Sequence, residues 1–223
     1  LFRLSRGSVA AYKKRLAGTG QEQLVRGSMY VHVYRNPKAA SLDHLAWQLR
    51  QARQVPIELI DKHALQEIEP HIADDFEAAI LIKQQGRASD PAGIGIALAE
   101  KALAKGAQHI QTKVQEIHPD QGSGCQLVTD QGVFAAKKIV LAAGVWSCQL
   151  LARFGIKLPL EAERGYHLVL RNPGITINHS VMDADQKYVA SLMQAGVRVA
   201  GTAEFAGLEA APNYARARRF ADQ

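Results

Sequence analysis

Lys138-Ile-Val-Leu-Ala-Ala-Gly144 is the stretch of sequence that decides the fold. Its continuous apolar character is typical of a strand that is buried on both faces, as in a parallel sheet. The stretch ends in small residues, which let a ligand approach the backbone at the carboxyl end of a strand. Two interpretations remain open from the residues alone. The stretch is either a strand end that contacts a ligand or a tight turn into a helix near Trp146.

The patterns on both sides of this stretch predict a mixed α/β chain. An apolar stripe after Ser41 (Leu42, Leu45, Ala46 and Leu49) predicts a helix that Ser41 caps, and further helices are expected after Asp61 and Asp90-Pro91. Strands are expected at 28–34, 57–60, 78–83, 109–117, 125–129, 133–136, 161–170, 188–193 and 197–205. The part of the chain after Gly155 is therefore expected to be mostly antiparallel.

The composition excludes several classes of protein. The chain has 223 residues, 47% of them hydrophobic, and a formal net charge of +6. A disordered chain and an integral membrane protein are excluded, because the apolar content is ordinary and no apolar run approaches the ~20 residues that cross a bilayer. The basic residues are scattered apart from a late cluster of three arginines, so no nucleic-acid partner is expected.

The cysteines and histidines give no sign of a metal site. Cys125 and Cys148 do not form a CxxC pair, and the eight histidines contain no HExxH pattern. Free cysteines fit a reducing compartment, which favours a cytoplasmic location. Because the chain begins with Leu1 and has no signal peptide, we expect a processed protein or a piece of a longer one.

Six segments occur in the order that is typical of one family. They are Gly86–Pro91, the helix that runs to Ala107, Thr112–Ile117, Lys138–Trp146, Arg164–Leu168 and Val197–Gly207. Together they resemble the flavin-dependent D-amino-acid oxidase family, and bacterial D-amino-acid dehydrogenases in particular. The resemblance implies an α/β (α+β) fold with an antiparallel-sheet substrate domain and a partial, Rossmann-like FAD-binding domain.

Two features of that family are absent from this sequence. The family opens with a GxGxxG strand and helix that cradle the FAD pyrophosphate, and it closes with a flavin-contacting segment that supplies the carboxylate-binding arginine. The chain is therefore expected to be an internal fragment. Residues 1–85 would be the first part of the substrate domain, 86–157 a central slice of the FAD domain, and 158–223 the second part of the substrate domain.

The resemblance implies FAD as cofactor and oxidation of the Cα–N bond of D-amino acids. The Cα hydrogen passes as hydride to the flavin, and the imino acid hydrolyses to a keto acid and ammonia. A glycine- or sarcosine-type amine oxidase and a non-catalytic binding domain are the alternatives. The isolated fragment is expected to be inactive and to lose FAD.

The resemblance also implies cofactor contacts. The backbone at Val114 matches a contact with the adenosine half of FAD, and the strand end matches contacts at Ala142, Ala143, Gly144 and Trp146. Val114 as an ordinary core residue of a strand is the alternative.

Four residues are the candidates for the substrate site. Tyr188 matches an aromatic residue over the substrate pocket, where its hydroxyl would bind the substrate carboxylate and its ring would exclude solvent. Glu204 would attract the substrate amine or orient a neighbour, with an exposed strand glutamate as the alternative. Arg164 is the best cationic candidate in the chain, and His167 follows it closely in sequence.

The expected partners are an amino-acid substrate and, for a respiratory dehydrogenase, a quinone of the respiratory chain at the membrane surface. That partner would place a cytoplasmic protein peripherally on the inner membrane. A homodimer is expected as well, because apolar surface is exposed where strands of an FAD domain would pair. Strand 139–143 should lie in a largely buried sheet, separate from the antiparallel sheet that joins 28–34 to 161–205.

Overall fold

The computed structural model describes residues 5–119 and 124–221. The chain divides into two units, each of which is described by itself. The first unit comprises Leu1–Lys105, Gly165–Ala203 and Pro212–Gln223, and the second comprises Gly106–Arg164 and Glu204–Ala211. The assignment of these parts to substrate and FAD domains stays a prediction.

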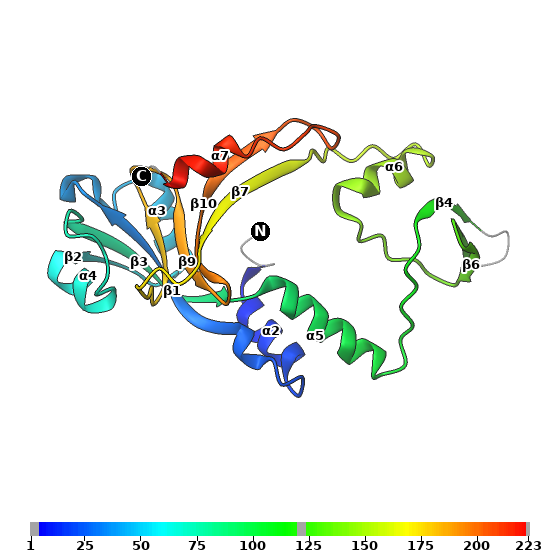
Figure 1. Ribbon diagram of the computed structural model, residues 1–223, viewed down its shortest axis with the longest axis horizontal. Helices are drawn as coiled ribbons and strands as arrows, with labels where there is room; N and C mark the ends of the chain where they lie inside the picture. The colour runs from blue at the N-terminus through cyan, green and yellow to red at the C-terminus, as the bar shows by residue number, and fades with distance from the viewer. Residues whose placement is uncertain (1–4, 120–123, 222–223) are drawn as a thin grey trace. The chain divides into compact units, whose positions relative to one another are not determined.

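A seven-stranded sheet dominates the chain, with the strand order β2-β3-β1-β8-β9-β10-β7 (Figure 1). Its strands are β1 (Val25–Tyr34), β2 (Ile57–Asp61), β3 (Ala78–Ala88), β7 (Glu163–Leu170), β8 (Ser180–Asp183), β9 (Val189–Met193) and β10 (Gly196–Phe205). The sheet joins the segments that sequence analysis placed together, which confirms the mixed α/β class. It differs in one respect, because β1 pairs antiparallel with β3 but parallel with the unexpected strand β8.

The two faces of the sheet have separate cores. Alternation along β1 directs Val31 and Val33 to one face, where they pack with Leu65 of α4 (Lys62–Ile68). The other face buries Tyr34 against Trp47 of α3 (Leu45–Gln51). Each face is thus covered by one short helix.

The helices confirm most of the capping signals. Asp61 Oδ1 accepts a hydrogen bond from the Ala64 amide at 2.9 Å, as expected for the cap of α4. Helix α5 (Pro91–Leu103) follows Asp90 and ends before Gly106, whose φ is +91°. In Figure 1, α5 lies beside α2 (Ser8–Leu16). Lys101 Nζ of α5 donates a hydrogen bond to the carbonyl of Arg15 in α2 at 2.7 Å.

The prediction for α3 is wrong in its cap and its buried face. His44, and not Ser41, is the N-cap residue, and Leu45 is 69% exposed. Trp47 is 6% exposed and is the residue that α3 buries. Ser41 instead accepts a bond from the Asp43 amide at 3.1 Å, which is a local turn that competes with a helix start.

The second unit holds a three-stranded antiparallel sheet of β4 (Val114–Pro119), β5 (Cys125–Thr129) and β6 (Gly132–Ala136). The predicted hairpin 125–136 is confirmed, whereas the strand expected from residue 109 begins only at Val114. A short 3₁₀ helix, η3 (Gly144–Trp146), leads into α6 (Ser147–Ala152).

The buried strand predicted at 139–143 is wrong. Residues 138–143 have no regular secondary structure, and Val140 is 90% exposed. A strand of a parallel sheet needs a hydrogen-bonded neighbouring strand, and the described residues place none beside this segment. Its apolar composition therefore marks a surface that the described part of the chain leaves open.

Short elements complete the chain. They are the 3₁₀ helices η1 (Glu22–Leu24), η2 (Pro37–Ala39) and η4 (Arg219–Ala221) and the helix α7 (Ala215–Arg218). Of the helices that the structure describes, none combines the length and the apolar character needed to cross a membrane.

Candidate functional site

Tyr188 lies directly before β9, half-buried, at the end of the turn that joins β8 to β9. Its ring contacts that of Phe220 edge-on, with 6.4 Å between the centroids. Burial raises the pKa of the Tyr188 hydroxyl, and the negative charge of Asp183 raises it further. Arg35, whose guanidinium also reaches this hydroxyl, lowers the pKa in part, and the hydroxyl stays protonated at neutral pH, as an ordinary phenol does.

The turn before Tyr188 is held by the carboxylate of Asp183, which is 1% exposed. Its Oδ1 accepts from the amides of Asp185 at 2.8 Å and Gln186 at 2.9 Å. The backbone closes the turn, because Asp183 N donates to Tyr188 O at 3.0 Å. Lys187, just before Tyr188, has a φ of +61°, a conformation that costs energy for a residue other than glycine and persists where the surroundings fix it.

Arg35 extends this network. Its Nη1 donates to Asp183 Oδ2 at 2.7 Å and its Nε to Asp75 Oδ2 at 2.6 Å, while its guanidinium carbon lies 4.3 Å from the centre of the Phe76 ring. Sequence analysis missed Arg35 and Asp183. The Asp-x-Asp pattern at 183–185 was a signal for an Asx turn, but nothing local in the sequence connects it to Arg35.

The structure brings two of the predicted substrate residues together in the second unit. Arg164 Nη1 lies 3.2 Å from Glu204 Oε2, and the two side chains are 31% and 13% exposed. Arg164 Nη2 also donates to the carbonyl of Ala210 at 2.7 Å. The two charges neutralise each other, so a substrate carboxylate at Arg164 has to compete with Glu204.

Arg164 and Trp146 also line one pocket of the second unit. The pocket measures about 400 Å³, and Trp146 is 61% exposed. The other lining residues are Val145, Glu161, Ala162, Glu163, Gly207 and Leu208. A planar side chain beside an ion pair could hold a ring on one side and a polar group on the other.

His167 does not join either group. It is exposed on β7, whereas its neighbour Tyr166 is 5% exposed and accepts a hydrogen bond from the Asn213 amide at 2.6 Å. Alternation along the strand directs the two side chains to opposite faces. The described contacts therefore give His167 no partner residue from the predicted site.

Comparison with known proteins identifies the family. The family model described as "FAD dependent oxidoreductase" (DAO) matches residues 1–223. The chain belongs to this family. A D-amino-acid oxidase of Bradyrhizobium diazoefficiens is 34% identical over 92% of this chain and 49% of its own length. A D-amino acid dehydrogenase of Rhizobium rhizogenes is 27% identical over 93% of this chain and 51% of its own length.

The fold of this DAO family member also matches solved structures. Glycine oxidase from Geobacillus kaustophilus superimposes with a TM-score of 0.78 and 22% sequence identity, over 94% of this chain and 56% of that one. The chain thus spans about half the length of the curated relatives it matches. The family predicted from the six sequence segments is confirmed.

FAD is the cofactor of the family, and the residues proposed to contact it allow such an approach. Ala142, Ala143 and Gly144 are exposed, and a Cβ on Gly144 would meet no atom within 4 Å. Bare backbone of this kind fits contact with the edge of a dinucleotide. Val114 is half-buried and pairs with Thr129. The phosphate-binding GxGxxG pattern does not occur in the sequence.

Proposed function

We propose that this chain takes part in the FAD-dependent oxidation of D-amino acids to keto acids and ammonia. The observation that carries the proposal is the placement of Tyr188, a protonated phenol on a turn that Asp183 fixes. Every amino-acid substrate carries a carboxylate, which is the acceptor that such a hydroxyl suits. The names of the two curated relatives support the same class of substrate.

In this proposal each group of residues has one task. Tyr188 binds the substrate carboxylate, and the Asp183 turn keeps its side chain in one position. Bound FAD supplies the acceptor for the hydride that leaves Cα. The segment 142–146 and Val114 hold parts of the cofactor. Glu204 attracts the substrate amine and Arg164 restrains Glu204, because the two are already paired.

We further propose that the electrons pass to a quinone of the respiratory chain, as in a dehydrogenase. This partner would bring a cytoplasmic protein to the surface of the inner membrane. A quinone analogue and molecular oxygen, offered separately to the reduced protein, distinguish the dehydrogenase from the oxidase.

The test of the function is anaerobic flavin reduction in the intact protein. D-alanine, D-methionine, L-alanine, glycine and sarcosine are mixed with it separately, and the loss of flavin absorbance is followed. We expect reduction by the D-amino acids and none by L-alanine. Reduction by glycine and sarcosine alone would favour the glycine- or sarcosine-type amine oxidase. Reduction by none of the five would overturn the proposal.

A further inference from the structure

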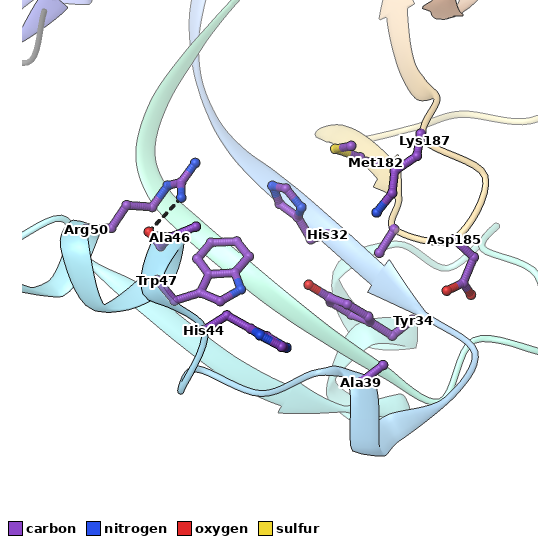
Figure 2. A pocket seen from close by; sticks show the side chains of 11 residues that line it. His32, Tyr34, Ala39, His44, Ala46, Trp47, Arg50, Met182, Asp185 and Lys187 are labelled. Carbon is purple, nitrogen blue, oxygen red and sulfur yellow. Dashed lines mark hydrogen bonds between the residues drawn. The ribbon is translucent and has the colours of Figure 1, made fainter.

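A pocket of about 450 Å³ lies between β1, α3 and the turn after β8, all in the first unit (Figure 2). It lies on the sheet face opposite Val31 and Val33, and α3, the segment before it and the turn after β8 complete the lining. The lining residues are His32, Tyr34, Ala39, His44, Ala46, Trp47, Arg50, Met182, Ala184, Asp185 and Lys187. None of the candidates from the sequence is among them, and Tyr188 is not either. The pocket therefore has a different lining from the site proposed above, although Asp185 and Lys187 belong to the turn that carries Tyr188.

Two cations reach this pocket from different elements. Figure 2 shows Arg50 of α3 and Lys187 of the turn on either side of His32. Neither cation lies within 4.0 Å of a carboxylate in the part of the chain that the structure describes. The acidic residue of the lining, Asp185, lies 3.8 Å from Arg35 instead. The positive charge in the pocket is therefore not balanced by its own lining.

His32 between the cations is neutral at pH 7. Burial lowers its pKa to about 4, with further contributions from the charges of Arg50 and Lys187. Both charges thus act on the same point in the pocket. Its Nε2 is buried and has no hydrogen-bond partner among the described residues, so His32 adds an aromatic surface and not a third cation.

The remaining wall is aromatic and firmly packed. The rings of His32 and Trp47 meet edge-on at 5.0 Å, and Trp47 is 6% exposed. The guanidinium carbon of Arg50 lies 4.9 Å from the centre of the Trp47 ring, and Arg50 Nη1 donates to the carbonyl of Ala46 at 2.8 Å. These contacts hold the guanidinium in place, so little conformational freedom is lost when it binds an anion.

We propose that this pocket binds a small aromatic carboxylate. The carboxylate lies between Arg50 and Lys187, and the ring lies against the wall of Tyr34, Trp47 and Met182. The volume is in the range of small-molecule sites, and an apolar lining with a few charged groups is their usual composition. The half-buried guanidinium of Arg50 and the exposed ammonium of Lys187 favour an anion over its neutral isostere, because each can donate a charge-assisted hydrogen bond.

Phenylacetate is the probe, and isothermal titration calorimetry on the intact protein is the measurement. We expect a Kd of about 1 mM or tighter, and binding at least about tenfold weaker for phenylacetamide, which has the same shape without the charge. Arg50→Gln and Lys187→Ala should each weaken phenylacetate binding about tenfold. Arg50→Lys keeps the charge and should retain most of the affinity.

Arg53→Gln is the matched control. Arg53 lies two residues after the end of α3. Its Nη1 donates to the carbonyl of Leu49 at 3.0 Å, just as Arg50 does to Ala46, but it does not line the pocket. The affinity of the Arg53→Gln variant for phenylacetate should equal that of the wild type. In NMR spectra of the wild type and of Arg53→Gln, the ring resonances of His32 should shift when phenylacetate is added. This shift would locate the probe in the pocket.

Three results would overturn the proposal. The first is no binding of phenylacetate up to about 50 mM. The second is equal affinity in Arg50→Gln, Arg53→Gln and the wild type. The third is a loss of binding in Tyr188→Phe, which would place the probe at the proposed substrate site. None of these measurements depends on flavin reduction, so the pocket and the proposed function can fail separately.

Discussion

A Cβ atom on Gly201 would lie 2.6 Å from the Cα of Tyr188 and 2.8 Å from its Cβ. Real Cβ atoms do not approach other atoms so closely, so β10 can pass Tyr188 only with a glycine at this position. The proposed substrate-binding tyrosine is thus fixed from two sides, by the Asp183 turn and by the backbone of Gly201.

Gly201→Ala should therefore displace Tyr188. We expect a loss of about 1–3 kcal/mol in the free energy of unfolding, measured with urea, together with weaker substrate binding. Gly165→Ala on β7 is the control, because a Cβ there would meet nothing within 4 Å. It should leave stability unchanged or raise it by up to about 1 kcal/mol. Equal destabilisation by both variants would contradict the close approach.

Tyr188→Phe should slow flavin reduction or weaken substrate binding without releasing FAD. Loss of a hydrogen bond to a charged group costs about 1.5–3 kcal/mol, which is about ten- to a hundredfold. Stopped-flow reduction by several D-amino acids measures the effect. Tyr12→Phe removes a hydroxyl from a side chain that is 46% exposed on α2 and should change nothing. Unchanged reduction in Tyr188→Phe would remove this residue from the site.

Asp183→Asn should be far more costly than Asp75→Asn, although both carboxylates bind Arg35. Asp183 is 1% exposed, and breaking its pair should cost about 3 kcal/mol, the lower end for buried pairs because Arg35 is itself 35% exposed. The Asp75 side chain is 55% exposed, so its loss should cost at most about 1 kcal/mol. Urea unfolding measures the free energy of unfolding of both variants. Similar losses in the two variants would contradict the role of Asp183 as the buried partner of Arg35.

The local elements of this fold were readable from sequence, because strands 28–34 and 78–83 and the cap at Asp61 depend on neighbouring residues. The strand β8 could not be predicted from the sequence, because its four residues pair with β1, which lies far away in the chain. The apolar composition of residues 139–143 indicated a buried strand. Burial also depends on which other segments pack against these residues, and no local sequence pattern specifies that.

The site was predicted less completely than the fold. Sequence reasoning selected Arg164 and Glu204 separately, and their ion pair became visible only when β7 and β10 were placed in one sheet. Arg35 had no signal at all, because its buried partner, Asp183, lies on a strand that was itself missed. The roles of Tyr188 and the cofactor-contacting residues stay predictions.

His32 should make the protein less stable as the pH falls. Its pKa is about 4 in the folded state against an ordinary value of 6.5, so the unfolded state binds the proton first. The stability due to neutral His32 is fully present above pH 6.5 and is lost as the pH falls towards 4. His32→Phe should reduce the difference in melting temperature between pH 7 and pH 4.5. His63→Phe, at a side chain that is 85% exposed, should leave it unchanged.

The isolated 223-residue chain should be colourless, inactive on D-amino acids and self-associating. Val140, Ile156 and Leu160 of the second unit are 90%, 47% and 53% exposed, which is a high exposure for apolar side chains so close in sequence. Val140→Lys should lower the dimer fraction in sedimentation velocity. Ile96→Lys, at a residue that is 59% exposed on α5, should not. A yellow protein with stoichiometric flavin would show that the cofactor contacts are misplaced.

The parallel pairing of β1 with β8 has a consequence for synthesis on the ribosome. The Met29 amide donates to His179 Nδ1 at 3.1 Å, although 150 positions separate the two residues. At about 5–20 residues per second, the edge of β1 that faces β8 waits roughly 8–30 s for its partner to be made. During that interval β1, β2 and β3 can assemble, while this edge offers unpaired backbone groups to any other strand. The nascent chain is therefore most exposed to mispairing, and most in need of a chaperone, before residue 180 leaves the ribosome.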